Sequence, residues 1–204
     1  MSDSPAADSP VDQSRRNWVA ITAGAGAIGG VAVAVPFVSS FAPSERAKAA
    51  GAPVEADISA LKPGEKMTVE WRGKPVWILR RTKEQLASLK KTDAEVADPK
   101  SQRNPGELTP EYARNEYRSI KPEFLVAVGI CSHLGCSPTD KLVPGAQPSL
   151  PDDWQGGFLC PCHGSTFDLA GRVFKNKPAP DNLEVPPHMY LSDTVLMIGE
   201  DKKA

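Results

Sequence analysis

Six residues that can bind metals or form disulfides lie in two short boxes of this 204-residue chain. The boxes are CSHLGC at residues 131–136 and CPCHGS at residues 160–165, and they hold all four cysteines and two of the three histidines. Thiolate sulfur and imidazole nitrogen are ligands for zinc, copper and iron. A Cys-x-His pair in the first box and a Cys-x-x-His pair in the second would supply two thiolates and two imidazoles. One cysteine is left over in each box, and these two could close a disulfide between the loops.

Four kinds of site could use these residues. A structural zinc site of two cysteines and two histidines needs neither the glycine and proline flanks nor the extra cysteine in each box. A domain that is only cross-linked by disulfides leaves both histidines without a role. A thioredoxin-like pair has two residues between its cysteines, whereas Cys160 and Cys162 have one. A [2Fe–2S] centre with cysteines on one iron and histidines on the other uses two ligand pairs and leaves one cysteine pair.

Length, composition and charge narrow the class of protein. A chain of this length holds one domain of ordinary size and an appendage, so a large two-lobed enzyme is not expected. The net charge of -1 leaves no basic surplus to neutralise a phosphate backbone, so nucleic acid is not expected as a partner. With 16 glycines and 20 prolines, the chain is expected to be folded and rich in loops.

The N-terminal region predicts an export signal and a membrane anchor. Residues 17–44 contain no charged residue, and a transmembrane helix is predicted at residues 17–42 because about 20 apolar residues cross a bilayer. A cleaved signal peptide would have a shorter apolar region. Lysine and arginine counts are equal on both sides of the run, so they do not predict its orientation. Arg15 and Arg16, in a polar tail at residues 1–16, resemble a twin-arginine signal, which predicts export of an already folded body.

The region after the anchor is predicted to be a hinge followed by a β-rich domain. Residues 43–56 are small and polar, as in a flexible tether. The domain, residues 57–204, has short turn-separated runs without βαβ spacing, which predicts an all-β, antiparallel sandwich or barrel. One helix is expected at residues 83–91, capped by Thr82, and a polar stretch to residue 120 has a further turn after Pro110. The predicted strands are residues 67–71, 75–80, 124–130, 156–160, 183–185, 188–191 and 194–199.

The two boxes resemble those of the Rieske iron–sulfur family of ubiquinol–cytochrome c reductases. The run at 124–130, the sequences KPAP at 177–180 and NLEVP at 182–186, and the single N-terminal anchor are also similar to that family. The stretch 82–120, with YARNE at 112–116, resembles the extra segment of proteobacterial members. The resemblance covers nearly all of the chain after residue 14. It implies an antiparallel β-sandwich with an inserted cluster-binding subdomain at about residues 131–174.

Carried over to this sequence, the resemblance implies one Rieske-type [2Fe–2S] cluster per chain. Cys136 and Cys162 would form a disulfide, and Ser165 would donate its hydroxyl to a cluster sulfur. Neutral imidazoles in place of thiolates raise the reduction potential to about −150 to +300 mV, the range needed to oxidise a quinol. Cys131 and Cys160 would bind one iron through their thiolates. His133 and His163 would bind the other iron through ring nitrogens.

The resemblance also implies a function and a location. The chain would be the iron–sulfur subunit of ubiquinol–cytochrome c reductase, an enzyme of the respiratory electron transport chain. Ubiquinol on a cytochrome b partner would hydrogen-bond to His163, the catalytic residue, and release an electron and a proton. The head would then swing on the hinge to a c-type cytochrome, although the hinge could also be a passive spacer. A dimeric complex is expected in the lipid bilayer of the bacterial inner membrane, with this single-pass chain's head on the periplasmic side.

Two other Rieske proteins fit parts of the sequence. The small subunit of an exported, arsenite-oxidase-like molybdenum enzyme would share the disulfide and the twin-arginine signal, but the segment 82–120 and the NLEVP sequence argue against it. A cytoplasmic Rieske ferredoxin of a ring-hydroxylating system would lack the disulfide pair and the membrane span.

Three residues stand apart from the motifs. Phe167 lies where the family usually has a tyrosine whose hydroxyl bonds to a ligand sulfur, and Lys177 replaces a usual glycine. The missing hydroxyl predicts a lower reduction potential than in close relatives. A solvated lysine charge would have a weaker, opposite effect. The third histidine, His188, is predicted to be a surface or structural residue.

Overall fold

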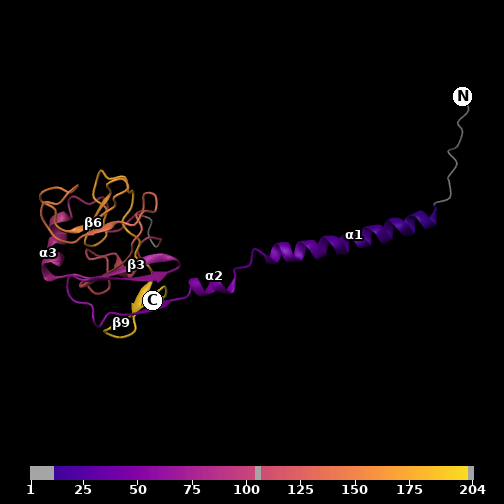
Figure 1. The fold of residues 1–204 in the computed structure, drawn as a ribbon, viewed down its shortest axis with the longest axis horizontal. Helices are drawn as coiled ribbons and strands as arrows, with labels where there is room; N and C mark the ends of the chain where they lie inside the picture. The colour runs from indigo at the N-terminus through magenta and orange to yellow at the C-terminus, as the bar shows by residue number, and fades with distance from the viewer. Residues whose placement is uncertain (1–11, 104–106, 202–204) are drawn as a thin grey trace, which may run out of the picture. The chain divides into compact units, whose positions relative to one another are not determined.

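A computed structural model of the chain describes residues 12–103 and 107–201 (Figure 1). The chain divides into two units, residues 1–48 and residues 49–204, and the boundary falls inside the predicted hinge. Most of the predicted export tail, residues 1–11, lies outside the described residues.

The first unit contains helix α1 (Gln13–Ser39) at the position of the predicted anchor. Asp12 caps the helix, because its carboxylate accepts the backbone N–H groups of Ser14 and Arg15 at 3.0 and 3.3 Å. The 27 residues extend about 40 Å, and an 18-residue window has a mean hydropathy of 1.9. By length and composition α1 can therefore cross a membrane. It begins and ends earlier than predicted, so Arg15 and Arg16 lie in its first turn and not in a tail.

The predicted hinge contains more secondary structure than the sequence suggested. Residues Glu45–Ala50 form the short helix α2, and Val54–Asp57 form strand β1. The helix forms because alanine, glutamate, lysine and arginine have high helix propensity, and Ser44 Oγ accepts the backbone N–H of Ala47 at 3.2 Å. Strand β1 forms because all four of its residues pair with β9 (Val195–Ile198). The irregular part of the hinge is therefore shorter than residues 43–56.

In the described part of the second unit, nine short strands form three antiparallel sheets. The first sheet has the order β1-β9-β8, and β8 is His188–Tyr190. The second has the order β2-β3-β4, formed by Lys66–Trp71, Lys74–Arg80 and Phe124–Val128. The third has the order β5-β6-β7, formed by Thr139–Lys141, Gly157–Leu159 and Thr166–Asp168.

The second sheet lies between two hydrophobic cores. Successive residues of β3 point to opposite faces of the sheet. Val76 and Ile78 pack in one core with the first sheet, whereas Trp77 packs in the other core with Phe158 and Phe167 of the third sheet. Figure 1 shows β6, β3 and β9 following one another across this unit in the same order. The predicted all-β, antiparallel sandwich is confirmed. The third sheet, in which β6 and β7 flank the second box, packs against the face of the second sheet that is turned away from the first sheet.

Helix α3 (Lys83–Thr92) interrupts the strands as predicted. Thr82 and Gln85 form a reciprocal capping box, with side chain to backbone distances of 2.9 and 3.2 Å. A 3₁₀ turn, Glu111–Ala113, follows Pro110. The further turn predicted after Pro110 is therefore present.

The strand predicted at residues 183–185 is absent from the described structure. The N–H groups of Leu183 and Val185 bond to the carbonyls of Gly171 and Leu108, which belong to two separate segments, so no ladder forms. Strands β1, β5 and β7 were not predicted, and β4 is shorter than expected.

Candidate metal centre

The two boxes form loops with the same backbone turn. In each box the N–H of the first residue donates to the carbonyl of the sixth, at 2.8 and 2.7 Å. The N–H of the fifth residue donates back to the carbonyl of the first, at 3.1 and 3.0 Å. The fifth residues, Gly135 and Gly164, have φ values of 81° and 74°, a left-handed conformation that favours glycine. The glycine in each box is therefore needed to turn the chain back on itself.

A disulfide joins the two loops. Cys136 and Cys162 are bonded, and their Cα atoms lie 6.7 Å apart. Cys131 and Cys160 are free and buried. The structure thus contains the pairing that the resemblance implied, and it leaves one free thiol at the start of each box.

The disulfide brings the four predicted ligands onto facing loops. The two buried thiols, Cys131 and Cys160, belong to the same hydrophobic core cluster. The rings of His133 and His163 lie 4.7 Å apart between centroids and are nearly perpendicular. His133 is half-buried, His163 is exposed, and Leu134 between the first histidine and glycine is 72% exposed. The histidine side of the loops is therefore accessible, and the thiol side is not.

One ring nitrogen of His133 tests whether these loops fit a metal cluster. Its Nδ1 is buried and has no hydrogen-bond partner among the described residues. An unpaired buried polar atom costs about 1–3 kcal/mol, a cost that a bond to iron would remove. Two buried thiols and two histidines on the same pair of loops also match the donors of a Rieske cluster. The residues present therefore fit a [2Fe–2S] group.

The surroundings of the Cys131 thiol act on its pKa in both directions. Burial raises the pKa of this thiol, and the nearby Cys160 raises it further. The nearby backbone N–H of His133 and hydroxyl of Ser165 lower this pKa. Because iron binds the thiolate, these two groups support ligation. Ser165 thus lies beside a predicted ligand, and the resemblance implied that it donates to a cluster sulfur.

The segment at residues 177–183 contacts both boxes, and sequence reasoning did not assign it a place in the site. Ser132 in the first box donates its hydroxyl to the Asp181 carbonyl at 2.7 Å. The backbone N–H of Ala179 donates to Ser165 Oγ in the second box at 2.9 Å. The prolines of the KPAP sequence, which restrict the backbone, were the available signal.

The three residues outside the motifs lie in different environments. Phe167 is fully buried in β7, opposite Phe158. Lys177 is exposed. His188 is buried in β8, and its Nδ1 lies 2.8 Å from the Pro186 carbonyl. A structural role for His188 agrees with its place in the first sheet, and a surface position does not.

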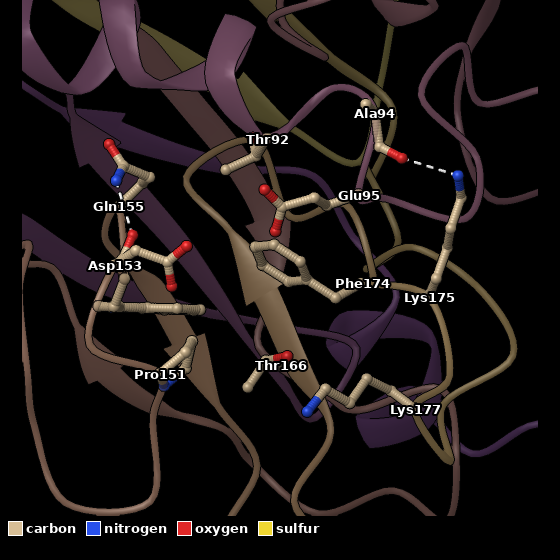
Figure 2. A pocket seen from close by; sticks show the side chains of 11 residues that line it. Thr92, Ala94, Glu95, Pro151, Asp153, Gln155, Thr166, Phe174, Lys175 and Lys177 are labelled. Carbon is tan, nitrogen blue, oxygen red and sulfur yellow. Dashed lines mark hydrogen bonds between the residues drawn. The ribbon is translucent and has the colours of Figure 1, made fainter.

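A cavity of about 420 Å³ lies outside this pair of loops, between residues 92–95, 151–155 and 174–177 (Figure 2). Figure 2 shows the Glu95 carboxylate beside the ring of Phe174, and Lys175 Nζ donating to the Ala94 carbonyl at 2.7 Å. None of the four predicted ligands lines this cavity. This cavity and the candidate metal centre are therefore separate sites.

Comparison with known proteins defines the class. Residues 107–187 match the family model described as "Rieske [2Fe-2S] domain". The "Ubiquinol-cytochrome c reductase iron-sulfur subunit" of Allochromatium vinosum is 57% identical over 92% of this chain and 89% of that protein. The protein of the same name from Bradyrhizobium diazoefficiens is 39% identical over 98% of this chain and 100% of that protein. A solved chain titled "Hyperthermophilic respiratory Complex III" is 27% identical, covers 87% of this chain and 98% of its own length, and has a TM-score of 0.45.

This chain therefore belongs to the Rieske family of ubiquinol–cytochrome c reductase iron–sulfur subunits. Its cofactor is a Rieske [2Fe–2S] cluster. The zinc, disulfide-only and thioredoxin interpretations of the two boxes are wrong.

Proposed function

We propose that this chain is the electron-carrying subunit of a cytochrome bc1 complex, and that it passes electrons from ubiquinol to a c-type cytochrome in a respiratory chain. One structural observation supports this best. Two disulfide-linked loops place two histidine rings 4.7 Å apart, one of them exposed, and bury two free cysteines. The histidine side of this set of metal ligands therefore faces solvent. An electron carrier that meets its partners at its surface needs such an exposed side.

The ligand assignment follows from the same loops. Cys131 and Cys160 would hold one iron, and His133 and His163 would hold the other. When bound, the cluster supplies one-electron chemistry at about −150 to +300 mV. The buried thiols exclude water from the cysteine side, and the exposed loop gives a substrate access to the histidine side.

His163 is the catalytic residue in this proposal. It is exposed, whereas His133 is half-buried, so a quinol hydroxyl reaches His163 more easily. A histidine that binds iron through one ring nitrogen keeps the other nitrogen free. That nitrogen accepts the hydrogen bond of the quinol hydroxyl and then its proton.

The N-terminal unit supports membrane attachment in a bacterial inner membrane. α1 is the single-pass anchor, and Arg15 and Arg16 at its start belong to a twin-arginine signal that exports the head to the periplasm. The partners are the cytochrome b and c-type cytochrome subunits, ubiquinol and the lipid bilayer, in a dimeric complex. No observation favours the arsenite-oxidase-like alternative.

The test is purification of the detergent-solubilised protein with its native partners. We expect b- and c-type haem to copurify and the EPR and visible spectra to be those of a Rieske centre. Alanine at Cys131, His133, Cys160 or His163 removes the cluster signal, because the loss of one ligand leaves an iron open to water. His188→Phe is the matched control, since this histidine lies in another sheet and keeps the signal. A normal Rieske spectrum in His133→Ala, or a wild-type protein without haem partners, would contradict the proposal.

A further inference from the structure

The 177–183 loop contacts a hydroxyl in the second box. The Ala179 N–H donates to Ser165 Oγ at 2.9 Å, and this hydroxyl lies close enough to Cys131 to lower the pKa of its thiol. A serine hydroxyl has one proton and two lone pairs. Because the Ala179 N–H occupies a lone pair, the position of this loop helps to direct the single proton toward sulfur.

The C-terminal end of the loop is bonded to a distant segment of the chain. Asn182 donates its side-chain amide to the Asp98 carbonyl at 2.9 Å and to Ser101 Oγ at 3.3 Å. Arg118 donates to the Leu183 carbonyl at 2.7 Å and to Ser101 Oγ at 2.8 Å. The Ser101 oxygen is therefore shared by Arg118 and Asn182, and it links the arginine to the loop.

Arg118 is a fully buried cation whose hydrogen bonds to the described residues all go to neutral groups. Burial lowers the pKa of Arg118 to about 10, so it is charged at neutral pH. Its guanidinium makes five hydrogen bonds, and the acceptors are Ser101 Oγ, Thr109 Oγ1 and the carbonyls of Ala170, Gly171 and Leu183.

Two of these residues have an unfavourable backbone conformation. Arg118 and Ser101 have φ values of 49° and 50°, in the left-handed region that disfavours residues with a Cβ atom. Such conformations persist where the surrounding interactions enforce them. The hydrogen bonds between Arg118, Ser101 and the loop are the interactions available to do so.

We propose that Arg118 is a positioning residue for the iron–sulfur site. Together with Ser101 and Asn182 it fixes the 177–183 loop, so that the Ala179 N–H keeps the Ser165 hydroxyl directed at a sulfur of the cluster. This inference rests on the proposed function, because it concerns the cluster that Cys131 binds. A hydrogen bond to a sulfur of the cluster stabilises the more electron-rich, reduced state, so loosening the loop lowers the midpoint potential.

The test is a redox titration of Arg118→Lys in the full-length protein. Lysine keeps the positive charge of Arg118, but its ammonium group lacks the planar, forked shape of the guanidinium. It has three N–H donors, which cannot bond to all five acceptors. We expect the equilibrium constant for one-electron reduction to fall at least about threefold, which is about 30 mV at 59 mV per factor of ten. The cluster content per chain stays unchanged.

Arg81→Lys is the matched control. Arg81 is also buried, burial also lowers its pKa to about 10, and it also bonds only to neutral groups. These acceptors do not include the 177–183 loop, and they are Ser119 Oγ and the carbonyls of Tyr117, Pro122 and Leu169. We expect a comparable loss of thermal stability and an unchanged potential. Equal potential shifts in the two variants would show a general structural effect and overturn the proposal.

A double-mutant cycle with Ser165→Ala tests the route of the effect. If Arg118 acts through Ser165, Arg118→Lys shifts the potential in the wild-type background and not in the Ser165→Ala background. Equal shifts in both backgrounds overturn the proposal. If Arg118→Lys does not accumulate, Ser101→Gly removes the shared hydroxyl, accommodates the left-handed backbone, and must lower the potential in the same Ser165-dependent way.

The two proposals fail in different ways. A wild-type protein without a Rieske spectrum overturns the proposed function and this inference with it. A normal wild-type spectrum with unchanged potentials in Arg118→Lys and Ser101→Gly overturns only the positioning role.

Discussion

Phe167 offers a test of how one side chain sets the redox potential of the site. It is fully buried in β7, two residues after Ser165, where the family usually has a tyrosine. Phe167→Tyr restores a hydroxyl that can donate to a ligand sulfur and stabilise the reduced state. If this bond contributes about 1 kcal/mol, the potential rises by about 40 mV, since a one-electron couple changes by 59 mV per ~1.4 kcal/mol. Redox titration of the two proteins measures the difference.

Phe167→Leu is the control for this prediction, because it changes the packing of the ring and adds no donor. We expect no rise in that variant. The exposed Lys177 ammonium is screened by solvent and does not replace the missing hydrogen bond. An unchanged or lower potential in Phe167→Tyr would mean that another group already donates to the sulfur.

His188 should make the stability of the protein depend on pH. Burial lowers the pKa of His188 below its ordinary value of 6.5, and its Nε2 is buried without a partner among the described residues. Above pH 6.5 the ring is neutral in the folded and unfolded states and contributes nothing. As the pH falls below 6.5, the unfolded chain gains a proton that the folded chain does not, so the free energy of unfolding falls by up to about 1.4 kcal/mol per pH unit.

Thermal unfolding of wild type and His188→Phe at pH 7.5 and pH 5.5 measures this effect. The phenylalanine keeps an aromatic ring against Tyr112, which lies 5.6 Å from the imidazole between ring centroids. We expect the loss of stability at the lower pH to be smaller in the variant. An equal loss in the two proteins would assign the pH dependence to groups other than His188.

At the residue scale, the sequence predicted side chains whose chemistry is visible in a motif and missed those whose role depends on burial. The two free cysteines, the disulfide and Ser165 lie together as the resemblance implied. Arg81 and Arg118 were not predicted, because an arginine in a polar stretch is usually solvated. Only the folded chain shows that backbone carbonyls from several segments surround each guanidinium.

Some of the helices and strands around the site were predicted from the sequence, and others were not. The strands predicted at residues 67–71 and 75–80 from their β-rich runs, and the helix predicted after Thr82 from its cap, are all present. Strands β5 and β7 have three residues each, too few to show a period of two. They form because the box loops bring them against β6, and this information is tertiary.

The disulfide is the main constraint on these loops. It closes a sequence separation of 26 residues, worth about 3–4 kcal/mol in the loop-entropy model. Cys136→Ser and Cys162→Ser should therefore lose the cluster faster on warming, while their ligand set is unchanged. The rate at which the visible absorbance of the cluster decays at raised temperature measures this.

The double variant with serine at residues 136 and 162 is the control for the disulfide. If the cross-link alone matters, the double variant loses its cluster no faster than either single variant. Decay rates equal to that of the wild type would remove the disulfide from the account of cluster stability.

At the scale of the whole molecule, the functional question is whether the head moves relative to the anchor. The chain divides into two units at residues 48 and 49, inside the short helix α2. Prolines at residues 47–50 would break this helix and hold the backbone in an extended, stiffer form. If electron transfer requires the head to swing between two partners, turnover of the assembled complex falls several-fold while the cluster spectrum and potential stay unchanged.

Glycines at residues 47–50 are the matched control for this change. They also destabilise α2, but they leave the segment flexible. A moving head predicts that the proline variant is slow and the glycine variant is not. Slow turnover in both variants would mean that the helix itself is required. Unchanged turnover in the proline variant would contradict the swing of the head, and the segment would then be a passive spacer. The reason is that a stiffer segment can slow only a step in which that segment changes its shape.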